Sequence, residues 1–490
     1  MDRLVALRIK GELFWATALF LLLLLILMPG IPYWLFLVPF FITFLLVSIK
    51  YPSVGLLILT FSHSFSGIIR WKDQLVFLLA GFSTLLAVIF LLSAVTRGLV
   101  WGRFKLPIKK DDLWSSKLMF SILFLLLLLL TVNILSQGKG ALTNVMMFRE
   151  YIIPLLIFPI AVSIFSERPK ECKVILSALF IGSAIIAFIN IIHYVFDLPI
   201  ARSRWVMHFD ATTGLASEIP ELRLIFGIPF PRMNHLLGLS GASAGGVYFI
   251  TMGILGYFLL KSNSIGAWRR ILYFCCFVNL IAAFLTFSLA VVVAILFVIM
   301  YLVSMSKKGI KATILVFCGI FTTPILILLL RLSNEQNPIN LAQNYIYDVW
   351  SGLIYPMLSK FDSILIGDGL GLKSGGAIGI ADFANEKYAQ LTDQWFFVAL
   401  YQLGLIGFIL TIATIVVPLW IIREKLRTEV DKSISYVVMG AGIVVAGFVG
   451  FSHGAAPIER LFSLPLFLVI AIIVSMPYKK ITKSSSKRFN

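Results

Sequence analysis

The sequence predicts an all-α, polytopic integral membrane protein with about 14 transmembrane helices. Hydrophobic residues make up 60% of the 490 positions and charged residues only 13%, whereas soluble domains carry roughly 25% charged residues. Apolar runs recur along the chain, and a run of about 18 or more residues can cross about 30 Å of hydrocarbon as a helix. Because a helix satisfies its own backbone hydrogen bonds, it is the default spanning structure in lipid.

The candidate spans form a single membrane domain over residues 1–490. They are 12–29, 32–48, 54–69, 75–96, 118–136, 151–165, 174–196, 236–260, 271–286, 288–305, 312–330, 394–420, 434–452 and 461–477. The apolar run 271–305 is too long for one helix, and we expect a break near Thr286-Phe287-Ser288. Two hydrophilic segments, 197–235 and 331–393, are predicted to be long loops.

Positive charge predicts the orientation. If the N-terminus is cytoplasmic, about two thirds of the 41 Lys and Arg residues fall in cytoplasmic segments, as the positive-inside rule expects. Both termini are then cytoplasmic, and both long loops lie on the outer face. The net charge of +18 follows from this topology and from contact with anionic membrane lipids, and we expect no nucleic-acid partner.

The cysteines do not indicate a disulfide framework or a metal site. The chain has four of them, without CxxC spacing, in or beside predicted helices. We interpret them as small apolar packing residues.

The first outer loop contains four basic residues, and all are arginines. They are Arg202, Arg204, Arg223 and Arg232. A guanidinium group stays charged and can bind phosphate at two points, so a diphosphate at the membrane surface is a natural partner. The alternative is that these arginines form ordinary ion pairs with the acidic residues of the same loop.

The first outer loop leads directly into a helix that begins with small residues. Arg232 and His235 stand at the mouth of the span 236–260, which opens with the stretch Leu237–Gly246. Small residues allow neighbouring helices to approach closely, and they could equally admit a ligand to the backbone.

The second outer loop carries a glycine-rich turn and a carboxylate at a helix entrance. The stretch Ile364–Leu372 contains the turn, and Tyr345–Tyr355 is predicted to be an interfacial helix. Asp393 and Gln394 immediately precede an apolar helix. A carboxylate there suits the helix dipole and can simply cap the helix, but it is also placed to take a proton from a sugar hydroxyl.

In this order, these features resemble the O-antigen ligase and polymerase superfamily of bacterial envelope glycosyltransferases, over residues of about 150–475. The landmarks are Arg232 before a small-residue helix, Leu285-Thr-Phe-Ser, the turn Ile366-Gly-Asp-Gly-Leu-Gly, and Thr392-Asp-Gln-Trp followed by Gly404-Leu-Ile-Gly. The resemblance implies a GT-C-like arrangement in the bacterial cytoplasmic membrane. It also implies an undecaprenyl-diphosphate-linked oligosaccharide as donor, with no cofactor and no metal.

The resemblance assigns roles to several residues. Asp393 would act as general base, and Arg232 with Arg223 would hold the donor diphosphate. The further substrate contacts would be Arg202, Arg204, Arg331, Arg149, His235, Gln394 and His453. A chain-length regulator and a flippase are the partner proteins that such an enzyme implies.

Two departures from the family pattern bear on the activity. Asp393-Gln394 stand where ligases usually have a histidine, which favours a polymerase of lipid-linked repeat units over a ligase. Leu289 stands where the group often has an arginine, so that cationic contact is either missing or supplied by Arg331 or Arg149. Outside the enzyme class, the alternative is a flippase, which would be expected to show two similar halves and short loops.

Overall fold

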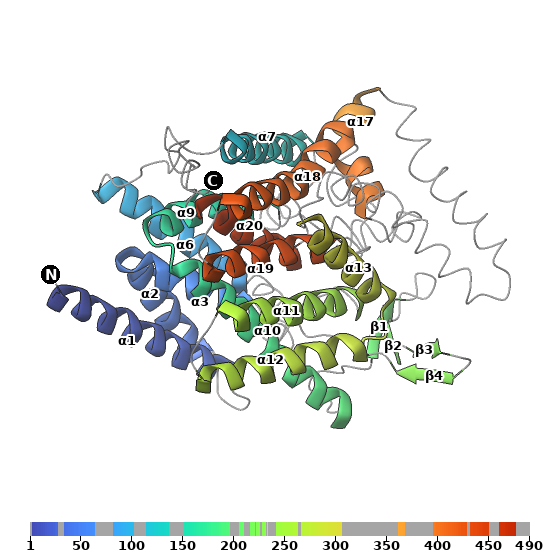
Figure 1. The fold of residues 1–490 in the computed structure, drawn as a ribbon, viewed down its shortest axis with the longest axis horizontal. Coiled ribbons are helices and arrows are strands. Elements are labelled where there is room, and N and C mark those ends of the chain that lie inside the picture. Colours follow the sequence, from blue (N-terminus) through green and yellow to red (C-terminus); the bar gives the residue numbers. More distant parts are fainter. Residues whose placement is uncertain are drawn as a thin grey trace, which may run out of the picture.

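The computed structural model describes residues 2–27, 34–63, 82–101, 114–136, 151–196, 205–209, 216–220, 222–225, 228–231, 233, 242–262, 266–305, 361–367, 395–428, 432–449 and 460–476. These residues form a bundle of helices, with two β-hairpins beyond the ends of α11–α13 (Figure 1). The helices are α1 (Asp2–Leu27), α2 (Trp34–Lys50), α3 (Pro52–His63), α6 (Phe82–Trp101), α7 (Trp114–Ser136), α9 (Ile153–Glu167), α10 (Glu171–Phe196), α11 (Ala242–Ser262), α12 (Gly266–Leu285), α13 (Leu289–Ser304), α17 (Phe361–Ile366), α18 (Trp395–Thr428), α19 (Lys432–Val449) and α20 (Arg460–Ser475).

A helix overlaps each predicted span except 312–330, which lies outside the described residues, as do residues 64–69 and 75–81 of two other spans. Five helical segments are long and apolar enough to cross a membrane: Ser116–Leu135, Glu171–Phe196, Gly245–Ser262, Trp268–Leu285 and Gln402–Leu426. Other apolar helices in the described part of the chain are shorter, at 10–17 residues. The structure is therefore that of a helical membrane protein, and the number of spans stays a prediction.

Helix α7 shows how the sequence produces both a helix and a lipid-facing surface. Its centre is a run of leucines, which favour helix. Leu126 and Leu130 are buried against the bundle, whereas Phe124, Leu128 and Leu135 are exposed. An exposed apolar stripe of this size would be a liability in water and is expected where a helix faces lipid.

Small residues bring the central helices into close contact. A Cβ atom at Gly447 of α19 would overlap with Thr251 of α11, and one at Gly442 would overlap with Tyr301 of α13. The Tyr301 hydroxyl donates a hydrogen bond to the Met439 carbonyl at 3.3 Å. Helix packing of this kind depends on small side chains, because lipid tails provide no hydrophobic drive between helices.

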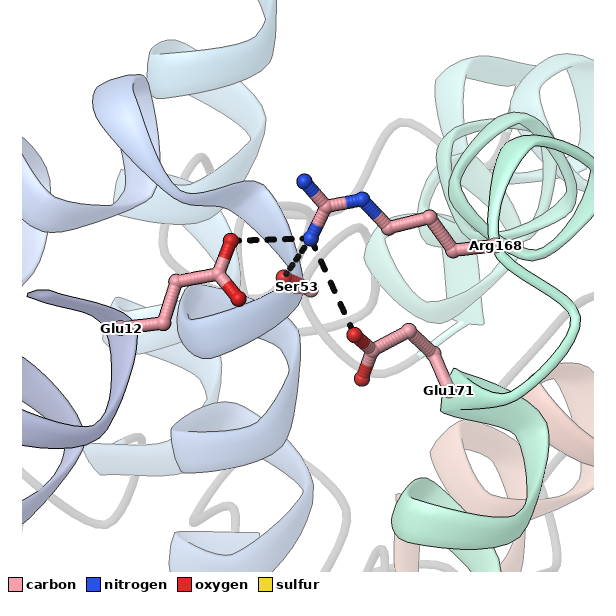
Figure 2. Close-up of polar contacts among 4 residues, drawn as sticks. All are labelled: Glu12, Ser53, Arg168 and Glu171. Carbon is pink, nitrogen blue, oxygen red and sulfur yellow. Dashed lines mark hydrogen bonds and ion pairs between the residues drawn. The ribbon is translucent and has the colours of Figure 1, made fainter. Parts of the chain in front are cut away.

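At one end of the bundle, Arg168 joins three parts of the chain (Figure 2). Its guanidinium lies 2.9 Å from a Glu12 carboxylate oxygen of α1, 3.2 Å from the Ser53 hydroxyl of α3 and 3.8 Å from Glu171 of α10. The charge pattern independently assigns all three regions to the cytoplasmic side. The contacts are consistent with that assignment, since segments on opposite sides of a membrane could not meet.

Further contacts link the same end to two more segments predicted to be cytoplasmic, at the end of α11 and the start of α19. Lys173, two residues after Glu171, donates to the Ser262 carbonyl at the end of α11 at 2.8 Å. Ser433, at the start of α19, donates to the same carbonyl at 3.4 Å.

Lys425 of α18 binds the C-terminal end of α20, at the same end of the bundle. It is buried, and its ammonium group donates to the carbonyls of Ile473, Val474 and Met476 at 2.7, 2.9 and 2.5 Å. These are carbonyls at the end of α20, where no further helical N–H is available. A cation there also suits the negative end of the helix dipole.

Candidate functional site

Most of the predicted site residues lie outside the described residues. This applies to Asp393, Gln394, Arg232, His235, Arg202, Arg204, Arg331, Arg149 and His453. The structure does describe backbone segments close in sequence to several of them. In these segments the landmarks contact one another in two pairs: Met233 with Leu285, and Gly367 with the kink at Gly404.

The segment 197–235, predicted to be the first outer loop, contains two antiparallel hairpins. Strands β1 (Trp205–Phe209) and β2 (Ala216–Pro220) form one, and β3 (Leu222–Ile225) and β4 (Ile228–Pro231) form the other. Arg223 lies in β3, opposite Phe230 of β4. The all-α prediction describes the helical bundle but missed these hairpins. The detectable signal was a β-prone stretch interrupted by a two-residue connection at Phe226-Gly227.

The chain just after Arg232 is fixed to the end of α12. The Met233 side chain is completely buried, and its backbone N–H donates a hydrogen bond to the Leu285 carbonyl at 3.0 Å. The first landmark, Arg232, is therefore adjacent to a residue anchored on the second, Leu285-Thr-Phe-Ser.

The predicted break between the two helices of the run 271–305 is confirmed. Helix α12 ends at Leu285 and α13 begins at Leu289, with Phe287 in the left-handed region at φ 44°. The Thr286 hydroxyl donates to the Ala283 carbonyl at 2.7 Å, and the Ser288 side chain accepts from the Ala290 N–H at 3.3 Å. The Ser288 side chain thereby caps the start of α13. The Thr286 hydroxyl adds to the hydrogen bond that the Ala283 carbonyl accepts from the Thr286 backbone N–H at 3.3 Å.

The small-residue start of α11 packs on this break. A Cβ atom at Gly246 would lie 2.5 Å from the Thr286 hydroxyl oxygen, closer than side chains can approach. Thr286 is fully buried. The glycine is therefore needed for close packing against the break. His235 precedes this small-residue stretch in the chain.

The glycine-rich turn of the second outer loop docks on a kink in α18. Gly367, the residue after α17, has φ 80°, and Gly404 inside α18 has φ 64° and ψ −172°. A Cβ atom at Gly367 would overlap with the Gln402 backbone, and one at Gly404 would overlap with the Leu365 backbone. Both positions thus require glycine for conformation and for space. This contact joins the third landmark to the fourth.

The kink divides α18 into two segments. The first, 395–403, directly follows Asp393-Gln394 in the chain. The second, 405–428, contains Lys425 near its C-terminal end. The prediction that a helix begins at this point is confirmed, since α18 starts at Trp395. A helix N-terminus attracts negative charge, which suits a carboxylate at position 393.

Asn133 of α7 ties the turn and the kink together. Its side-chain amide nitrogen lies 3.0 Å from the Ile366 carbonyl oxygen and 3.2 Å from the Gln402 carbonyl oxygen. Asn133 is 5% exposed. Sequence analysis missed this residue, because a single asparagine in an apolar helix gives no sign of a partner more than 200 residues away.

The described cysteines agree with their interpretation as packing residues. Cys172 and Cys275 are buried, and Cys276 is partly buried. Among the residues that the structure describes, no three His, Cys, Asp or Glu side chains gather as metal ligands would.

No protein-family model matches the chain, and no curated protein matches it.

Proposed function

We propose that this membrane protein is a polysaccharide polymerase of the bacterial cytoplasmic membrane. It would join undecaprenyl-diphosphate-linked oligosaccharide repeat units on the outer face, for O-antigen, capsule, exopolysaccharide or a related wall polymer. One observation supports the proposal more than any other. The four landmark segments, which are separated in the sequence, form two pairs, each with a backbone contact. Met233 contacts Leu285, and Gly367 contacts the Gln402–Gly404 kink.

The chemistry needs two kinds of group. An acceptor sugar hydroxyl attacks the anomeric carbon of the donor, a new glycosidic C–O bond forms, and the bond from that carbon to the diphosphate oxygen breaks. The diphosphate leaves with the bonding electrons, and its charge is stabilised by arginines. A carboxylate takes the proton of the attacking hydroxyl.

The residues of this chain would divide these tasks. Arg232 and Arg223 would hold the diphosphate, and Asp393 would receive the hydroxyl proton. Arg232 is the neighbour of the anchored Met233, and Arg223 lies in the β3–β4 hairpin of the same loop. Asp393 would be presented by the first segment of α18.

Substitution at the two central positions tests the assignment. Arg232→Ala and Asp393→Ala would each abolish elongation, with polymer length and amount measured by gel electrophoresis of the purified glycan. Arg270→Ala is the matched control, because Arg270 is an exposed arginine near the start of α12, at the end of that helix opposite to Leu285. Unchanged polymer in both central variants would show that these residues do not form the site.

A further inference from the structure

Asn133 contacts two backbone carbonyls that belong to two other elements. The Ile366 carbonyl is at the C-terminus of α17, where carbonyls lack helical donors, and the Gln402 carbonyl is beside the Gly404 kink. These partners are separated from Asn133 by 233 and 269 residues along the chain. One side chain of α7 therefore links α17 to the first segment of α18, across the direct backbone contact of Gly367 with the kink.

The side-chain amide is matched to this task. Its NH₂ group has two hydrogens, so it can donate one to each carbonyl. Aspartate has nearly the same size but, when ionised, only accepts hydrogen bonds. The alanine side chain can neither donate nor accept a hydrogen bond. Because the site is buried, loss of the amide would leave carbonyls without this donor in a place that water does not readily reach.

We infer that Asn133 is a positioning residue for glycosyl transfer, an inference that rests on the proposed function. By holding the kink against the Ile366-Gly367 turn, Asn133 orients the 395–403 segment, which directly follows Asp393-Gln394. Asn133 acts on the reaction only through this segment. A displacement of about 1 Å in a catalytic group can reduce the rate by about 10²-fold, so a loosened kink lowers turnover without removing any group that binds the donor.

Hydrogen exchange tests the clamp without any substrate. In Asn133→Ala, amides of 361–366 and 395–403 should exchange at least tenfold faster than in the unsubstituted protein, while those of α11 and α12 stay unchanged. Thr131→Val is the matched control, because among the described residues the Thr131 hydroxyl donates to a carbonyl of its own helix, that of Leu127, at 2.8 Å. Unchanged exchange in 361–366 and 395–403 would overturn the clamp.

Steady-state kinetics with a lipid-diphosphate oligosaccharide tests the link to catalysis. Asn133→Ala should lower kcat at least tenfold and leave KM for the donor within twofold, because Arg232 and Arg223, which would hold the donor diphosphate, belong to the segment 197–235 and not to the segment that Asn133 contacts. Faster exchange with unchanged kcat would overturn the positioning role. If the unsubstituted protein forms no glycosidic bond, the proposed function fails and the catalytic part of this inference fails with it, while the exchange result still decides the clamp.

Asn133→Asp provides a second variant of nearly equal size, in case the alanine variant does not accumulate. Its rate relative to the unsubstituted protein should rise as pH falls, because a protonated carboxyl regains one donor. A pH-independent ratio would contradict the role of the donated hydrogen bonds.

Discussion

The backbone N–H of Met233 donates a hydrogen bond to the carbonyl of Leu285 at 3.0 Å, which fixes the end of the first outer loop to the break between α12 and α13. Arg232 is the residue that precedes this anchor in the chain. The hairpin that contains Arg223 lies immediately upstream along the chain. An arginine held by its own backbone neighbour loses less conformational freedom on binding an anion than one in an unanchored loop.

A charge-conserving substitution tests two-point binding at Arg232. In Arg232→Lys the positive charge remains, but the planar fork that can hold two phosphate oxygens is lost. We expect kcat/KM for the lipid-linked donor to fall by about tenfold, equivalent to about 1.4 kcal/mol, and by more in Arg232→Ala. Arg270→Lys serves as control and should leave kcat/KM unchanged. Equal rates for Arg232→Lys and the unsubstituted protein would show that a point charge suffices.

The two glycines of the turn and kink should be indispensable for stability. Gly404→Ala would place a Cβ at φ 64° and ψ −172°, a region open essentially only to glycine, and would force it into the Leu365 backbone. We expect a loss of about 3 kcal/mol from strain and overlap together, with a similar loss for Gly367→Ala. Thermal unfolding in detergent measures both.

A glycine in open space provides the control for these two variants. No atom lies within 4 Å of a Cβ built at Gly266, so Gly266→Ala should change stability by no more than about 0.5 kcal/mol. If Gly404→Ala unfolded at the same temperature as Gly266→Ala, the kink geometry would be wrong.

Lys425 should stabilise the bundle through the end of α20. In Lys425→Met, three carbonyls lose a charged donor in a buried site, and we expect a loss of about 3 kcal/mol. Lys170→Met changes an exposed lysine at the same end of the bundle and should be neutral within about 0.5 kcal/mol. Equal melting temperatures for the two variants would contradict the capping role.

Much of this fold could be predicted because lipid imposes a simple rule on the sequence. Apolar length indicated the helices, and the excessive length of 271–305 indicated the break that Phe287 makes. The contact between Glu12 and Arg168 joins two segments that charge alone had assigned to one side. These features follow from local composition.

The rest depends on tertiary partners that composition does not encode. Gly404 lies in an apolar run with another glycine, Gly407, three residues later, and only the docking of Gly367 explains why the helix kinks at Gly404 and not at Gly407. Lys425 counted as one more cytoplasmic charge, yet it is 4% exposed. Asn133 was missed for the same reason, since its partners are backbone carbonyls whose availability is created by a helix end and a kink.

Cysteine labelling tests which end of the bundle faces the cytoplasm. We expect Ser217→Cys, in β2 of the first outer loop, to react with a membrane-impermeant maleimide in intact cells. Lys170→Cys, beside Arg168, should react only after the membrane is permeabilised, and the unsubstituted chain gives the background from its native cysteines. The reverse pattern would invert the topology and place the Arg168 end outside.

Reconstitution with a defined donor tests the central claim most directly. Purified protein would be mixed in detergent with an undecaprenyl-diphosphate-linked oligosaccharide and no nucleotide sugar, and the products resolved by size. A polymerase yields a ladder spaced by whole repeat units, with one undecaprenyl diphosphate released per bond formed. A single transfer to a different acceptor would indicate a ligase. No new glycosidic bond, together with movement of the lipid across liposomes, would contradict the proposal and indicate a transporter.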